Sequence, residues 1–171
     1  MMTYKVELAP PDIAAYAAGN MGIPYYTTFD SGKPGPHVLV NAVTHGNELC
    51  GAIVVDFLFR HDVRPTRGRL TLGFANYMAM LRFDPAAPTA SRYVDEDFNR
   101  LWSPAVLDGP RESVELRRAR EVRPLIDTVD FLLDLHSMQQ PCPPLVSRSQ
   151  SFYDLTFNQL RFLRWVVVVS L

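Results

Sequence analysis

Residues 37–48 read His37-Val-Leu-Val-Asn-Ala-Val-Thr-His-Gly-Asn-Glu48, and their local pattern is the strongest indication of the fold. The first part, residues 37–43, is a short apolar run rich in β-branched side chains, which is typical of a buried strand. Residues 44–47 favour a turn. Residues 48–60 are apolar almost all round, which indicates a helix packed against a sheet.

Two further strands are expected downstream of this helix. Residues 69–75 follow a polar loop and predict a second strand, so the order strand, helix, strand indicates a parallel βαβ unit with a right-handed crossover. Residues 131–135 predict a third buried strand, which ends at His136. The 171 residues therefore suit one α/β domain with a substantial core.

The segments around these elements are less regular. Residues 1–36 are rich in glycine and proline and are expected to be irregular, apart from a short helix at residues 12–18. Residues 83–110 predict a long loop, and loops of this length are usually functional. Apolar spacings of 3, 3, 4 and 3 predict a helix over residues 112–129, which Pro124 should kink or end.

Composition excludes several classes of partner. The formal net charge is -1, and no basic run resembles a nucleic-acid footprint. The apolar run Trp165–Val169 is far shorter than the roughly 20 residues of a membrane helix. No signal peptide is evident at the N-terminus, so a cytoplasmic location is expected. Whether the chain forms a homo-oligomer stays open.

The cysteines and the arginine cluster favour structural roles. Cys50 and Cys142 form no CxxC pair, and Cys50 is expected to be a small buried residue. Four arginines are expected to lie on a solvated helix face rather than in a phosphate-binding patch: Arg117, Arg118, Arg120 and Arg123.

Three side chains at strand ends predict a metal site. His45 and His136 each follow a strand, and ligands of open α/β sheets bind at the carboxyl ends of strands. Glu48 lies three residues after His45, so both can face one point across a helical turn. Two histidines and a carboxylate are a common zinc ligand set that leaves one position for water. Asp134 could orient His136, since alternate residues of a strand share a face.

Histidines outside this set favour a structural interpretation. A lone histidine at a strand end is more often hydrogen-bonded than metal-bound, and this applies to His37 and His61.

The long loop holds a second polar group, Ser91-Arg-Tyr-Val-Asp-Glu-Asp-Phe-Asn-Arg100. A guanidinium binds carboxylates through two parallel hydrogen bonds and stays charged, so Arg92 and Arg100 would suit an anionic substrate. Asn99 could add a neutral donor. The alternative is a surface loop whose acidic and basic side chains pair with each other.

Four ordered segments resemble the succinylglutamate desuccinylase/aspartoacylase family, which is related to the zinc carboxypeptidases. They are residues 44–51, 91–102, 115–122 and 134–137. The resemblance implies a zinc carboxypeptidase-like (phosphorylase/hydrolase-like) fold, with a mixed, largely parallel sheet and helices on both faces.

The resemblance also implies residue roles. One Zn²⁺ per chain would be held by His45, Glu48 and His136. Arg92 would polarise the scissile carbonyl, while Asn99 and Arg100 would hold a substrate carboxylate. The implied reaction is hydrolysis of an amide or ester bond of an N-acyl amino acid type of substrate by zinc-bound water. Peptide hydrolysis of the carboxypeptidase type is a weaker alternative.

The C-terminal part departs from the family pattern. The family places a general-base glutamate well after the third zinc ligand, whereas Ser137–Leu171 contains none. We therefore expect residues 1–145 to be the N-terminal part of a zinc hydrolase domain and residues 146–171 a tail without family character, as in a truncated gene product. Residues 162–169 favour one substitute strand. The alternative to a deacylase is an inactive zinc-binding fragment.

Overall fold

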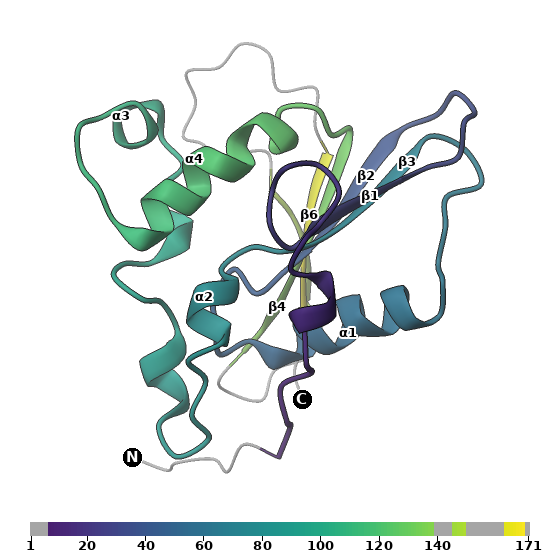
Figure 1. Cartoon of the computed structure of the whole chain (residues 1–171). Helices are drawn as coiled ribbons and strands as arrows, with labels where there is room; N and C mark the ends of the chain where they lie inside the picture. Colours follow the sequence, from purple (N-terminus) through teal and green to yellow (C-terminus); the bar gives the residue numbers. More distant parts are fainter. Residues whose placement is uncertain (1–6, 139–144, 150–162, 170–171) are drawn as a thin grey trace.

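Six strands form one sheet in this computed structural model, which describes residues 7–138, 145–149 and 163–169 (Figure 1). The strands are β1 (Tyr26–Asp30), β2 (His37–Ala42), β3 (Arg69–Phe74), β4 (Phe131–Ser137), β5 (Leu145–Ser149) and β6 (Leu163–Val169). Their order across the sheet is β1-β3-β2-β4-β6-β5. The three inner pairings are parallel, while β1 and β5 pair antiparallel at the two edges. The predicted mixed, largely parallel sheet is confirmed.

Two long helices cover opposite faces of the sheet. Figure 1 shows α1 (Leu49–Arg60) on one side and α4 (Val114–Ile126) on the other. Successive residues of β2 point to opposite faces, as the period of a strand requires. Leu39 accordingly packs in the cluster that contains Leu125 of α4, whereas Val40 packs in the cluster that contains Val55 of α1.

The strands and helices predicted from the sequence agree closely with the observed elements. The strand expected at residues 131–135 extends to Ser137, and the helix expected at residues 112–129 spans Val114–Ile126. Ser113 caps that helix, because its hydroxyl accepts a hydrogen bond from the Leu116 amide. Pro124 lies inside the helix, which ends shortly after it at Ile126. β6 confirms the strand expected near residues 162–169, whereas Cys142 lies outside the described residues.

The expectation that residues 1–36 are irregular is wrong for β1. Its sequence Tyr-Thr-Thr-Phe-Asp begins with aromatic and β-branched residues, and it pairs with β3. The flanking glycines and prolines outweighed this short signal in the sequence. The helix expected at residues 12–18 is one 3-10 turn, η1 (Ala14–Tyr16).

The predicted long loop contains only short turns. They are η2 (Pro88–Ser91), η3 (Phe98–Arg100) and α3 (Pro104–Leu107), and α2 (Tyr77–Met80) precedes them. The loop is therefore ordered by contacts with the rest of the domain rather than by regular structure of its own.

The arginine-rich side of α4 is not a uniformly solvated face, so the expectation for Arg118 is wrong. Arg118 is 1% exposed, and its guanidinium donates to the carbonyl oxygens of Ala75, Phe74 and Pro24. It also pairs with Glu121 at 2.6 Å. These contacts fasten α4 to the end of β3.

None of the helices in the described ranges is long and apolar enough to cross a membrane.

Candidate metal centre

Three elements bring the candidate ligands together. His45 lies in the turn after β2, Glu48 directly precedes α1, and His136 lies in β4. Because β2 and β4 are parallel neighbours, their carboxyl ends meet at the same edge of the sheet. The turn needs Gly46, where an added Cβ would lie 2.3 Å from the Ser91 carbonyl oxygen and 2.5 Å from the Ala79 carbonyl carbon.

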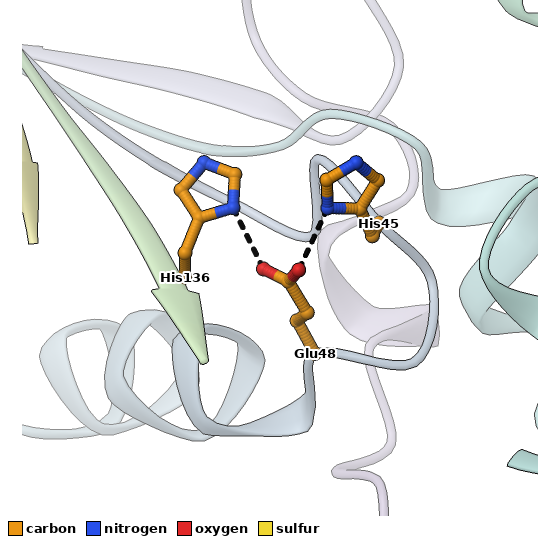
Figure 2. Close-up of side chains that lie close together, drawn as sticks. All are labelled: His45, Glu48 and His136. Carbon is orange, nitrogen blue, oxygen red and sulfur yellow. Dashed lines mark hydrogen bonds and ion pairs between the residues drawn. The ribbon is translucent and has the colours of Figure 1, made fainter. Parts of the chain in front are cut away.

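The ligand atoms converge on the Glu48 carboxylate. Nδ1 of His45 lies 2.7 Å from Oε1, and Nδ1 of His136 lies 2.8 Å from Oε2 (Figure 2). One candidate ligand atom from each of the three residues lies within 4.8 Å of the others, and all three residues are buried. Two imidazole nitrogens and a carboxylate oxygen fit the donor set of a zinc site with an open position. The structure therefore brings together the three residues that the sequence singled out.

Charge stabilises this cluster. Burial alone would raise the pKa of Glu48, but hydrogen bonds with His136 and His45 outweigh it and lower that pKa. Burial likewise opposes protonation of His136, yet hydrogen bonds with Asp134 and Glu48 raise its pKa to about 10. An imidazolium can donate from both nitrogens, so the protonated ring bridges the two carboxylates. A metal ligand must be deprotonated, so a metal at Nδ1 would replace that proton.

A buried polar network orients His136. Nε2 of His136 lies 2.9 Å from Oδ2 of Asp134, as the shared strand face suggested. Oδ1 of Asp134 accepts from Asn41 Nδ2 at 3.0 Å and from the Thr44 hydroxyl at 2.9 Å. The Tyr26 hydroxyl donates to Asn41 in turn. Carboxylates on the far nitrogen of a ligating imidazole fix its tautomer and raise its basicity.

The long loop reaches His45 from the opposite side. Nε2 of His45 lies 3.1 Å from Oδ1 of Asp97 and 2.9 Å from Nη2 of Arg92. Arg92 also pairs with Asp97 at 3.2 Å and lies 3.8 Å from Glu48. Burial alone would raise the pKa of Asp97, but the Asn99 amide and His45 outweigh it and lower that pKa. Acidic and basic side chains of the loop pair with each other, as expected if this segment were a surface loop. The pairing takes place next to the metal cluster, however.

Asn99 and Arg100 lie further along the same loop. The Asn99 amide donates to Asp97, while its side-chain Oδ1 is buried without a hydrogen-bond partner. Arg100 is exposed, and Nη1 donates to the Asn99 carbonyl oxygen at 3.4 Å. Within the described residues, no hydrogen bond or ion pair joins the Arg100 side chain to the three ligands.

His37, His61 and Cys50, which the sequence analysis expected to have structural roles, lie outside the three-residue metal cluster. His37 is buried, with Nε2 2.7 Å from the Thr71 hydroxyl, and His61 is exposed and stacks on Phe57. Cys50 is buried as expected, and burial raises the pKa of its thiol.

Sequence reasoning assigned no role to several residues of the site. Asp97 lies within the polar segment 91–100, so the sequence offered a signal for its role. Nothing in the sequence links Asn41 or Thr44 to Asp134, because about 90 residues separate them.

Comparisons with known proteins identify the family of this chain. Residues 34–160 match the profile of the succinylglutamate desuccinylase/aspartoacylase catalytic domain. This match extends beyond residue 140, whereas the motifs that resemble the family in the sequence analysis end before that residue. An N-acyl-aromatic-L-amino acid amidohydrolase (carboxylate-forming) from Rattus norvegicus is 31% identical over 116 residues, covering 63% of this chain and 35% of that protein. A probable aspartoacylase from Parasynechococcus marenigrum (strain WH8102) is 40% identical over 88 residues, covering 50% and 26%.

Solved structures share the fold. The succinylglutamate desuccinylase from Chromobacterium violaceum is 26% identical with a TM-score of 0.53, covering 67% of this chain and 37% of that one. An aspartoacylase family protein from Mesorhizobium loti has a TM-score of 0.62 at 19% identity, covering 85% and 55%. The chain spans about a third of the length of the first curated relatives it matches.

Proposed function

The chain belongs to the succinylglutamate desuccinylase/aspartoacylase family, and on that premise we propose that it is a zinc-dependent hydrolase of a small acylated, carboxylate-bearing substrate. The scissile bond is an amide or an ester, and N-acyl amino acids are the substrate class. The observation that carries the proposal is the convergence of His45, Glu48 and His136 next to the guanidinium of Arg92.

The residues of the site suit hydrolysis of an acyl bond. A zinc ion held by the three ligands supplies Lewis acidity, which activates water and polarises a carbonyl group. Arg92, about one-third exposed, lies beside His45 and can donate hydrogen bonds to the oxygen that gains negative charge. Its ion pair with Asp97 keeps the guanidinium in place before substrate binds.

A carboxylate on the substrate suits the outer part of the loop. Arg100 is exposed and close in sequence to Arg92, and its planar fork can take a carboxylate through two hydrogen bonds. Asn99 would assist as a neutral partner. The names of the relatives support this class, since the Rattus norvegicus protein is an N-acyl-aromatic-L-amino acid amidohydrolase and the Parasynechococcus marenigrum protein a probable aspartoacylase.

A second candidate is a chain that binds zinc without catalysing hydrolysis by itself. It is favoured by the engagement of the glutamates in the metal cluster, in the long loop and at the start of α4. Glu48 faces both imidazoles, Glu96 pairs with Arg111, and Glu115 binds backbone amides. A general base typically contributes about 10²–10⁴-fold to the rate, so its absence would leave little turnover.

Hydrolysis of a panel of N-acyl amino acids by the zinc-loaded chain separates the two candidates. We expect turnover, and we expect Arg100→Ala to raise KM while leaving the zinc content unchanged. Arg92→Ala should lower kcat by about 10²–10³-fold, the cost of losing an oxyanion donor. Arg117→Ala, an exposed arginine of α4, is the matched control and should behave like the wild type.

Two results would speak against the proposal. Full zinc occupancy without turnover on any substrate of the panel would favour the non-catalytic candidate. Turnover that is insensitive to both Arg92→Ala and Arg100→Ala would refute the roles given to the loop.

A further inference from the structure

Glu115 is a buried carboxylate outside the metal cluster. It lies in the first turn of α4 and is 0% exposed. Its Oε1 accepts from the Val94 amide at 2.5 Å and from Asn76 Nδ2 at 3.0 Å, and its Oε2 accepts from the Asp95 amide at 3.0 Å. The Glu96 amide donates to the same Oε2 at 3.3 Å. Three successive amides of the long loop thus point at one carboxylate.

This arrangement specifies one backbone conformation. Burying a carboxylate is costly unless it is fully hydrogen-bonded, and here Lys and Arg side chains form no ion pair with Glu115 within the described residues. Consecutive amides that converge on an anion form a concave binding site in the backbone. A glutamine could not accept all four hydrogen bonds, because one of its two polar atoms is a donor.

Further contacts fix the loop on both sides of these amides. Oδ2 of Asp95 accepts from the Val114 amide at 2.7 Å, so the loop and the start of α4 bind each other reciprocally. Upstream, the Gly46 amide donates to the Arg92 carbonyl oxygen at 3.0 Å. The segment of residues 92–96 is therefore held between the metal-ligand turn and α4.

The residues that flank the bound amides are those that reach the metal cluster. Arg92 and Asp97 lie on either side of residues 94–96, and both contact Nε2 of His45. Asn99 follows directly, with its amide on Asp97. A long loop loses much conformational entropy when it is ordered, so fixing it in the free protein lowers the cost of binding a substrate.

We infer that Glu115 is a positioning residue, which holds residues 94–96 so that Arg92 and Asp97 stay against His45 before substrate binds. The placement of the loop by Glu115 follows from the contacts alone. The effect of this placement on substrate binding and turnover rests on the proposed function. Glu115 follows the three amides by 19 to 21 residues, and in the part of the chain that the structure describes no hydrogen bond or ion pair joins it to the three ligands.

The test compares Glu115→Gln and Glu115→Asp with Glu112→Gln. Glu112 is an exposed glutamate close to the same helix start and serves as the matched control. Amide hydrogen exchange is measured at residues 94–96 in the zinc-loaded chain. We expect exchange about 10-fold faster or more in Glu115→Gln, as loss of buried hydrogen bonds implies, with α1 and β4 unchanged. Glu115→Asp keeps the charge and should lie between the two.

Kinetics on an N-acyl amino acid complete the test. We expect kcat/KM of Glu115→Gln to fall about 100-fold, as a small displacement of positioning groups produces, while the zinc affinity stays within about 3-fold. Partial recovery in Glu115→Asp would follow the exchange data.

Several results would overturn the inference. They are unchanged protection of residues 94–96 in Glu115→Gln, a loosened loop with unaltered kcat/KM, or loss of the folded state in both Glu115 variants while Glu112→Gln stays folded. If the wild type hydrolyses nothing, the proposed function fails, and the exchange data still decide whether Glu115 holds the loop.

Discussion

The two candidate ligand histidines are oriented by carboxylates on their far nitrogens. Asp134 faces Nε2 of His136, and Asp97 faces Nε2 of His45. When Nε2 carries a hydrogen and donates it to the carboxylate, the lone pair of Nδ1 is free for a metal. In this tautomer Nη2 of Arg92 cannot donate to Nε2 of His45 and donates instead to Oδ2 of Asp97, so the two oxygens of that carboxylate hold the imidazole and the guanidinium.

Replacing Asp134 tests this orientation directly. In Asp134→Asn the amide can present a donor to Nε2 of His136, which would favour the tautomer with its hydrogen on Nδ1. We expect zinc affinity to fall about 10–100-fold, the usual effect of removing a partner of a ligating histidine. A competition titration with a chelator measures the change. Asp127→Asn, at the exposed end of α4, should leave the affinity unaltered, and an unaltered affinity in Asp134→Asn would disprove the orienting role.

At the scale of elements, the site depends on close packing between the ligand turn and the long loop. Gly46 makes this approach possible, because its neighbours are backbone atoms that cannot rotate away. We expect Gly46→Ala to lose about 1–3 kcal/mol of stability through overpacking and to lose most of its zinc affinity.

Gly32→Ala is the matched control for that substitution. Gly32 has a φ of +70° and no neighbouring atom within 4 Å of an added Cβ, so it carries only conformational strain. It should lose stability and keep its zinc affinity. Equal zinc affinities in the two variants, measured by the same titration, would contradict the packing argument.

The attachment of α4 to the sheet depends on Arg118. Its removal leaves the carbonyl oxygens of Pro24, Phe74 and Ala75 without this donor. An unsatisfied buried polar group costs about 1–3 kcal/mol, so Arg118→Leu should lose about 3 kcal/mol or more in urea unfolding. Arg117→Leu, on the exposed side, should stay within about 0.5 kcal/mol of the wild type. Similar losses in both variants would show that Arg118 has no special role.

The elements with a repeating local pattern could be predicted from the sequence. Examples are the strands at residues 37–43 and 131–135 and the helix at residues 48–60. The spacing of their apolar residues follows from burial of one face or of all sides of the element. The convergence of His45, Glu48 and His136 was predictable for a related reason, since strand ends of a parallel sheet share one edge.

The remainder depends on contacts between distant segments. β1 forms because β3 provides an edge strand with which it can pair. Its own short strand pattern is a weaker sequence signal than the loop signal of the glycines around it. Arg118 is charged and belongs to an arginine-rich stretch, and its burial is explained by carbonyl groups of distant segments, at Pro24 and at the end of β3. The hydrogen bonds of Glu115 likewise join segments about 20 and 39 residues apart.

At the scale of the whole molecule, the candidate metal site ties together separate parts of the chain. The sheet brings β2 and β4 side by side, α1 presents Glu48, and α4 holds the loop that carries Arg92 (Figure 1). Ligands that lie far apart in the sequence meet only in the folded protein, so zinc binding should be coupled to folding. We propose that the three residues hold one metal ion.

The zinc content of the purified chain, measured by mass spectrometry after dialysis, shows whether these residues bind the metal. We predict about one zinc per chain in the wild type and in His61→Ala, whose histidine is exposed and lies outside the cluster, and almost none in His45→Ala. Full zinc content in a folded His45→Ala variant, or none in a folded wild type supplied with zinc, would contradict the account.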